Sequence, residues 1–408
     1  MYKRQASFKE AIEYSNKEIF CLESLPTTHA TQRKVIDARA RLAGYHISLT
    51  HHVEANEAVA PIANLAQELN YQKRLPMIYT AMGTYSDWVE ENYSEGFRYL
   101  SEASKISEKI KDTISLWYAN FFLGMNLSWN CEFEKGLEYL RKSLDLGVLA
   151  NNPITISTAK CGISTFNYVL HGKNDLAYQI SKESLQMAQE SGDIYIKGIA
   201  CSSHGMACYC KGLFNEAENT LLQALSFCEK AAQLGWWTNA AGFLGHVYFD
   251  MGEYEKAQAY YEKGILTLER TRIYPFFVNM WKVSVARSKV LNKDQDIKLS
   301  KIFEYYENIA VKIVKGWAAR HVGEILLNMD DQHISEAEDW VKKAIEEDKR
   351  NDTRWSLGGD YAFYAELFKR KGDQSKAKEN LAKAIDILKK CGADGWVKRY
   401  EEEMASLS

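Results

Sequence analysis

The stretch from Cys201 to Gly264 contains the same residue pattern twice, with an offset of forty residues, and this repetition constrains the fold of the whole chain. The paired positions keep their residue class or their size; they are Gly205 and Gly245, Gly212 and Gly252, Phe214 and Tyr254, Ala217 and Ala257, Leu221 and Tyr261, and Ala224 and Gly264. Self-similarity at one fixed offset indicates stacked supersecondary units, each of which buries its apolar face against its neighbours.

Each unit has the pattern of a helical hairpin. In the second copy, residues 244–248 predict one amphipathic helix, residues 251–254 a tight turn and residues 257–264 a second helix. Gly245 and Ala257 leave no large side chain where the two helices cross, so the backbones can approach closely. The chain is therefore expected to be all-α.

This pattern resembles the tetratricopeptide repeat. The resemblance rests on a Leu-Gly pair, a turn glycine and bulky and small residues at the family's spacing, carried by Leu244, Gly245, Tyr248, Gly252, Tyr254, Ala257, Tyr261 and Gly264. The family's usual period is 34 residues, so a forty-residue period predicts helices that are longer by nearly a turn. The resemblance implies a right-handed α-solenoid of stacked helix-turn-helix repeats.

The register of the repeat extends well beyond the duplicated stretch. The residues that open the second helices are spaced by 40, 41, 40 and 40 positions, at Gly96, Gly136, Ala177, Ala217 and Ala257. We expect one continuous solenoid, with irregular helical repeats over residues 1–72, regular repeats over 73–270, degenerate and then regular repeats over 271–392, and a capping helix over 393–408.

Three segments outside the regular repeats also have a helical pattern. The sequence predicts a long helix from Thr31 to His52 and a shorter one from Ala60 to Leu69, with Pro61 in its first turn, where proline is tolerated. Residues 296–311 are expected to be helical as well.

Charge and hydropathy exclude two classes of partner. The 408 residues include 51 basic and 54 acidic ones, for a net charge of −3, and no clustered basic face of the kind that nucleic-acid binding needs. No apolar run approaches the ~20 residues that cross a bilayer. We therefore expect a cytoplasmic protein that binds neither nucleic acid nor membrane.

The sequence shows no motif for a cofactor, a metal ion or a catalytic centre. The eight cysteines lack paired spacing, so we expect small buried thiols, with a redox or metal role as the alternative. His46, His51 and His52 cluster in sequence, but adjacent helical residues point to different faces. A glycine-rich phosphate loop and a nucleophile elbow are absent from the sequence. An enzyme whose site is assembled across repeats is the less favoured alternative.

In the tetratricopeptide family the first helices of the hairpins line a concave groove, and their inward side chains contact the partner. Carried over to this chain, that implies a mostly apolar set of groove-facing residues: Trp88, Tyr118, Phe121, Met125, Trp129, Phe166, Met206, Tyr209, His246 and Phe249. Large apolar patches tend to mark interaction sites. The alternative for any one of these residues is that it packs neighbouring first helices together.

A more charged surface is expected farther along the chain, either as a second site or as a solvent-facing surface. It comprises Trp317, Arg320, Glu324, Glu366, Lys369 and Arg370.

Together these observations predict a non-catalytic scaffold or sensor that binds a peptide or helix of a partner protein. Over much of its length, and most closely over about residues 235–400, the sequence also resembles the C-terminal repeat region of bacterial multidomain regulators; residues 250–257, 323–328 and 365–373 carry this resemblance. That resemblance implies a regulatory arm covalently linked to an upstream ATPase or nucleotide cyclase domain. The alternative is a stand-alone peptide-sensing regulator.

Overall fold

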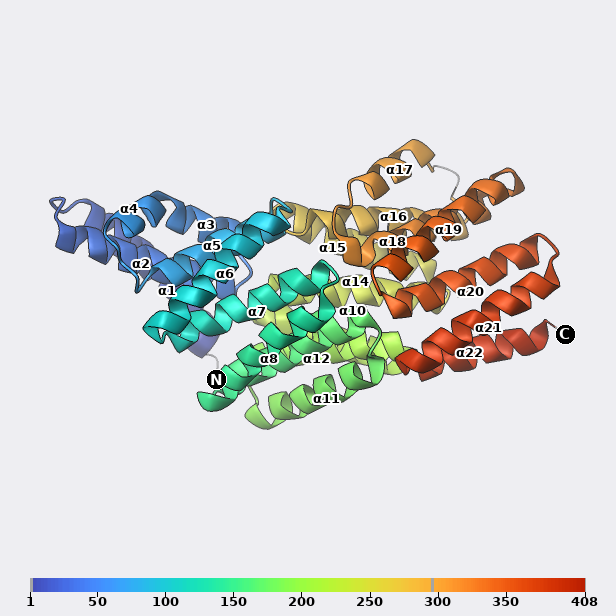
Figure 1. The fold of residues 1–408 in the computed structure, drawn as a ribbon, viewed down its shortest axis with the longest axis horizontal. Coiled ribbons are helices and arrows are strands. Elements are labelled where there is room, and N and C mark those ends of the chain that lie inside the picture. The colour runs from blue at the N-terminus through green and yellow to red at the C-terminus, as the bar shows by residue number, and fades with distance from the viewer. Residues whose placement is uncertain (1–2, 295–296, 408) are drawn as a thin grey trace.

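The computed structural model describes residues 3–294 and 297–407, and these residues form helices and no strand. The expected all-α solenoid is confirmed, and Figure 1 shows its hairpins stacked along an elongated, coiled molecule. No helix in the described ranges is both long and apolar enough to cross a bilayer.

The helices follow one another with short connections. The N-terminal ones are α1 (Lys3–Glu23), α2 (His29–Ser48), α3 (His52–Val59) and α4 (Ala63–Glu68). The hairpins that follow are α5 (Leu75–Trp88) with α6 (Tyr93–Ile110), α7 (Thr113–Trp129) with α8 (Phe133–Leu149), α9 (Pro153–Gly162) and α10 (Val169–His171) with α11 (Asn174–Ser191), α12 (Ile194–Lys211) with α13 (Phe214–Lys230), and α14 (Leu234–Asp250) with α15 (Tyr254–Thr271). The C-terminal helices are α16 (Pro275–Leu291), α17 (Leu299–Glu307), α18 (Lys315–Met329), α19 (Ile334–Arg350), α20 (Arg354–Arg370), α21 (Gln374–Cys391) and α22 (Asp394–Ser406).

The repeated glycines lie where the two helices of a hairpin cross. A Cβ atom at Gly245 would lie 2.5 Å from the Tyr261 ring, and one at Gly205 would lie 2.5 Å from Cγ of Leu221. Side-chain atoms do not approach this closely, because packed interiors have no room to yield. Helix packing therefore explains why these positions recur.

The single spacing of 41 residues has a structural cause in the hairpin formed by α9 and α10 with α11. Its first helix contains a π-helical turn, Ile163–Tyr168, between α9 and α10. A π-turn takes up one residue more than an α-turn, so the extra residue is accommodated without breaking the stack. Asn167 in this turn donates to the Phe133 carbonyl at 2.8 Å and to the Ser128 hydroxyl at 3.0 Å.

Three predicted helices differ in their boundaries. The helix expected from Thr31 to His52 ends at Ser48, because Thr50 has a φ of 65° at a corner that packs against Gly235. Residues 60–62 form a 3-10 turn with Pro61 ahead of α4. The helix expected over residues 296–311 covers only α17; residue 296 lies outside the described ranges, and the backbone is extended again at Val311.

Successive turns of the solenoid touch one another. The Tyr274 N–H donates to the Trp88 carbonyl at 2.7 Å, and the Lys211 ammonium donates at 2.8 Å to both the Gly392 carbonyl and the Asp394 carboxylate. The residues joined by these hydrogen bonds between turns are 181 to 187 positions apart in the sequence, which is between four and five of the forty-residue periods. In Figure 1 the start of α22 accordingly lies beside the end of α12. The inner face of the first helices is therefore partly closed by the next turn.

Candidate functional site

The ten residues predicted to face a groove lie on the first helices, and the structure places nine of them in the interior. Tyr118 is half-buried. The contact between turns covers part of the set: the Trp88 ring centroid lies 5.0 Å from that of Tyr274, and the Trp129 centroid lies 5.4 Å from that of Phe276. The inner face is thus not one open groove, and cavities remain on it at two places.

The first place, here named the aromatic cavity, has a volume of about 120 Å³. Five members of the predicted set line it: Trp88, Tyr118, Phe121, Met125 and Phe166. The other lining residues include Trp117 and Trp236, and none carries a charge. Such a cavity is suited to a neutral, apolar group.

The second place, here named the polar cavity, has a volume of about 470 Å³. It lies among α14, α16, α18, α20 and α22, and Tyr209 and Phe249 of the predicted set line it. Trp129, Met206 and His246 line neither cavity. Of the charged surface expected farther along the chain, Trp317, Arg320, Glu324 and Glu366 are in the wall of this cavity, whereas Lys369 and Arg370 do not line it.

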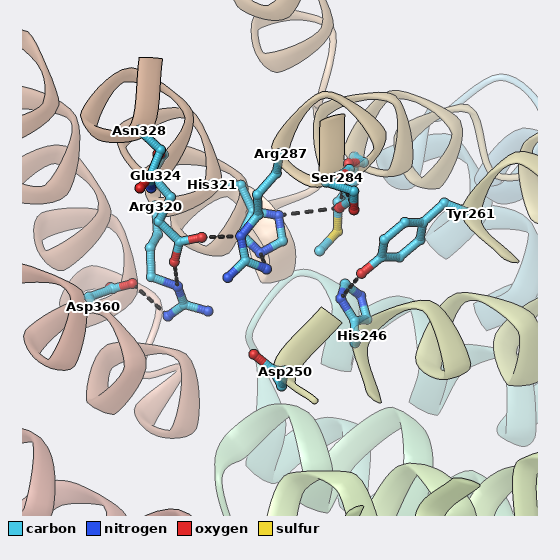
Figure 2. A network of polar contacts seen from close by, with 12 residues as sticks. His246, Asp250, Tyr261, Ser284, Arg287, Arg320, His321, Glu324, Asn328 and Asp360 are labelled. Carbon is cyan, nitrogen blue, oxygen red and sulfur yellow. Dashed lines mark hydrogen bonds and ion pairs between the residues drawn. The ribbon is translucent and has the colours of Figure 1, made fainter. Parts of the chain in front are cut away.

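A chain of four largely inaccessible charges with alternating signs lies at the polar cavity, and three of them, Arg287, Arg320 and Glu324, are in its wall (Figure 2). Arg287 on α16 forms an ion pair with Glu324 on α18, and Nε of Arg320 lies 3.6 Å from the same carboxylate. Arg320 also donates from Nη1 to Asp360 on α20 at 2.9 Å. A buried charge is tolerated only when a partner compensates it, so each member of this chain fixes its neighbours.

Burial controls the protonation of the groups around this chain. Burial and then the adjacent Asp348 carboxyl raise the pKa of Asp360 well above its usual range, so this carboxyl holds a proton more readily than a free aspartate. Burial and then Arg287 lower the pKa of both His246 and His321. These two imidazoles are therefore neutral near pH 7, and His246 shares a hydrogen bond of 2.7 Å with the Tyr261 hydroxyl.

Two donors in the polar cavity lack the partners that a ligand would supply. The buried indole N–H of Trp355 has no hydrogen-bond acceptor among the described residues. Arg399 donates to the Asp250 carbonyl at 3.0 Å and lies over the Trp396 ring, but no carboxylate in the described part of the chain pairs with it. The cavity therefore offers one neutral donor and one cation to a bound molecule.

The sequence prediction missed Arg287 and Arg399 as cavity residues, and Asp360 as the ion-pair partner of Arg320. A signal was present, because Arg287, Arg320, Glu324 and Asp360 all interrupt the apolar pattern of first helices. Their mutual pairing could not be predicted, since they lie on three different helices. Arg399 could not be placed because α22 meets this cavity only through the coiling of the solenoid.

A tetratricopeptide repeat family model matches residues 239–266, which lie within the hairpin of α14 and α15. The chain is a tetratricopeptide-like repeat protein. No curated protein matches its sequence.

Three solved structures show the extent of the structural likeness. A Rap protein complexed with Competence and Sporulation Factor shares 16% identity, covers 92% of this chain and 99% of its own, and has a TM-score of 0.54. The Rap conjugation gene regulator of the plasmid pLS20, in complex with the Phr* peptide, shares 15% identity over 85% of this chain and 96% of its own, with a TM-score of 0.57. A signal transduction ATPase with a tetratricopeptide repeat sensor from Pyrococcus horikoshii shares 15% identity over 91% of this chain and 55% of its own, with a TM-score of 0.45. At these identities the likeness shows the fold alone.

Proposed function

We propose that this protein is a non-catalytic receptor that binds a short peptide, or an extended segment of a partner protein, in the polar cavity. The observation that carries the proposal is a cavity on the inner face whose wall holds a compensated chain of charges, while Arg399 lacks a carboxylate partner and the Trp355 indole N–H lacks an acceptor among the described residues. Its volume of about 470 Å³ is within the range typical of ligand sites.

Arg399 and the Trp355 indole N–H define the chemistry of the ligand. Arg399 is the group that binds a carboxylate, either an acidic side chain or the C-terminus of a peptide, because a guanidinium pairs with a carboxylate through two parallel hydrogen bonds. The Trp355 indole N–H donates to a peptide carbonyl, and Tyr209 and Phe249 offer apolar contact. The five predicted residues of the aromatic cavity remain our candidates for binding an apolar side chain of a partner.

The likeness to the two Rap structures supports the proposal of a peptide receptor. The two Rap structures align with this chain over nearly their full length, and one of them is described as a complex with a peptide. The alternative is a regulatory arm of a larger ATPase or cyclase. The two differ in the size of the native protein, which an immunoblot of native lysate measures: the arm requires a product much longer than 408 residues.

The binding proposal can be tested without knowing the natural ligand. A phage-displayed library of random decapeptides is selected on the full chain, and the enriched peptides are measured by fluorescence polarisation. We expect enrichment of peptides with an acidic group and a loss of affinity of about tenfold or more in Arg399→Ala, since a charge-assisted hydrogen bond contributes about 1.5–3 kcal/mol. Lys398→Ala, on the same helix but outside the cavity lining, serves as the matched control.

Two results would refute the proposal. One is the absence of any enriched peptide family, and the other is peptide binding that Arg399→Ala and Trp355→Phe leave unchanged. A Phe166→Ala variant tests the aromatic cavity separately. Nucleotide hydrolysis by the purified chain would contradict the non-catalytic assignment.

A further inference from the structure

Three potential metal ligands meet at the junction of α11, α12 and α13, away from both cavities. His204 and Cys208 are four residues apart on α12, and Glu216 lies in the first turn of α13. One ligand atom from each lies within 4.8 Å of the other two. His204 and Cys208 are buried, whereas the Glu216 side chain is 44% exposed.

The repeat itself shows that these residues are exchanged for others in the next unit. Forty positions later, His204 and Cys208 are answered by Leu244 and Tyr248. Leu244 is fully buried, so the position is one that normally packs an apolar side chain. Placing polar ligands in such positions costs free energy unless they gain a partner. His204 has two such partners, Ser181 and Glu216.

The hydrogen bonds around His204 orient its Nε2 atom toward Glu216. The Ser181 hydroxyl lies 3.0 Å from the Tyr178 carbonyl, to which it donates, and 3.0 Å from Nδ1 of His204; in the tautomer with Nδ1 protonated, the Ser181 oxygen accepts from Nδ1–H. Nε2 of His204 lies 3.2 Å from the Glu216 carboxylate, and the two atoms share a hydrogen bond when Nε2 carries a proton. A cation bound between the nitrogen and the oxygen would take the place of that proton. Fixing the second ring nitrogen in this way is typical of metal-binding histidines.

We propose that His204, Cys208 and Glu216 bind one divalent ion of the Zn²⁺ class, with water as the fourth ligand. The 3.2 Å between nitrogen and oxygen is close to the separation of about 3.3 Å expected for two ligands about 2.0–2.1 Å from a tetrahedral zinc ion. A set of nitrogen, sulfur and oxygen ligands suits zinc, whereas calcium and magnesium prefer oxygen alone. On binding, the Cys208 thiol releases its proton to solvent and the thiolate forms the metal–sulfur bond.

The test uses the purified, untagged full chain with Zn²⁺ and Co²⁺ alone as probes. We expect one equivalent of Zn²⁺ by isothermal titration calorimetry, and Co²⁺ spectra with a thiolate charge-transfer band and tetrahedral visible bands. Glu216→Gln, at an exposed position, should weaken zinc binding by at least the 10–100-fold that even outer-shell partners contribute. Glu218→Gln, a nearby carboxylate outside the trio, is the matched control and should leave binding unchanged.

His204→Leu introduces the residue of the neighbouring unit, so the fold should be retained while zinc binding is lost. Cys208→Ser should remove the charge-transfer band, and Cys201→Ser on the same helix should retain it. Circular dichroism checks that each variant is folded. The proposal is overturned if the wild-type chain binds no stoichiometric zinc, or if Glu216→Gln and His204→Leu bind it as the wild type does.

Discussion

Contact between successive turns of the solenoid can be tested at a single glycine. Gly212 follows α12 with a φ of 81°, and a Cβ atom there would lie 2.4 Å from the backbone nitrogen of Trp396 and 2.7 Å from the carbonyl carbon of Gly395. Gly252 occupies the equivalent position one repeat later, has a φ of 82° and has nothing within 4 Å of such an atom. Gly212→Ala and Gly252→Ala therefore carry the same cost in backbone conformation, and they differ only in the contact between turns of the solenoid.

The expected difference in free energy of unfolding follows from what α22 loses when it is displaced. Both variants lose about 1–2 kcal/mol, because alanine disfavours the left-handed conformation. In Gly212→Ala the Trp396 indole also loses its 2.9 Å hydrogen bond to the Tyr209 carbonyl, a net cost of about 0.5–1.5 kcal/mol. Exposing the Trp396 side chain, now 6% exposed, costs about 1.5–3 kcal/mol. Gly212→Ala should thus be less stable than Gly252→Ala by about 2–4 kcal/mol.

Hydrogen exchange localises the effect, since repeat proteins can open in parts. We expect α22 amides to lose protection in Gly212→Ala and to keep it in Gly252→Ala. Small-angle scattering should show a larger radius of gyration for Gly212→Ala alone, and urea denaturation gives the stability difference. Equal stability of the two variants, with α22 protection unchanged in both, would refute the contact between turns.

Three further substitutions test other parts of the structure by urea denaturation followed by circular dichroism. Trp129→Ala should lower stability by about 3–5 kcal/mol, because this side chain is 3% exposed; a small loss would mean that it faces an open groove. Arg320→Met should cost about 3–5 kcal/mol by leaving buried carboxylates unpaired, and a second substitution, Asp360→Asn, should recover part of that loss. Hydrogen bonds from Lys342 and Lys371 lower the pKa of Glu338 from 4.5 to about 2. The ionised carboxylate therefore stabilises the fold above pH 4.5, and this contribution is lost as the pH falls toward 2. Glu338→Gln should therefore be less stable by about 1–2 kcal/mol at pH 7 and as stable as the wild type near pH 2.

The hairpins were predictable because their determinants are local. Gly245 and Ala257 fix the crossing of two adjacent helices, and the spacing of 41 before Ala177 pointed to an extra residue that the structure places in a π-turn. The break of α2 near Thr50 was not predictable, since it depends on Gly235 almost a full superhelical turn away. Local sequence thus determines the helical hairpin, whereas contacts between turns of the solenoid determine where a helix departs from the repeated pattern.

The candidate site was predictable only in part for the same reason. Tyr209 and Phe249 could be assigned to the inner face from their helix positions, because that assignment needs only the repeat register. Whether an inner-face residue is covered or open depends on which segment lies across from it in the next turn. Trp129 is covered because Tyr274 and Phe276 lie there, and nothing in its own hairpin indicates this.

The same geometry explains why the two cavities differ in character. Where the first turn meets the second, aromatic residues such as Trp88 and Tyr274 face each other, and the space left beside them is small and uncharged. Farther along, the first helices carry Arg287, Arg320 and Asp360 in place of aromatic residues. The space that remains there is larger, and charged and polar groups line it. The chemistry of each cavity therefore follows from residues that depart from the repeat, and its size follows from how the turns of the solenoid meet.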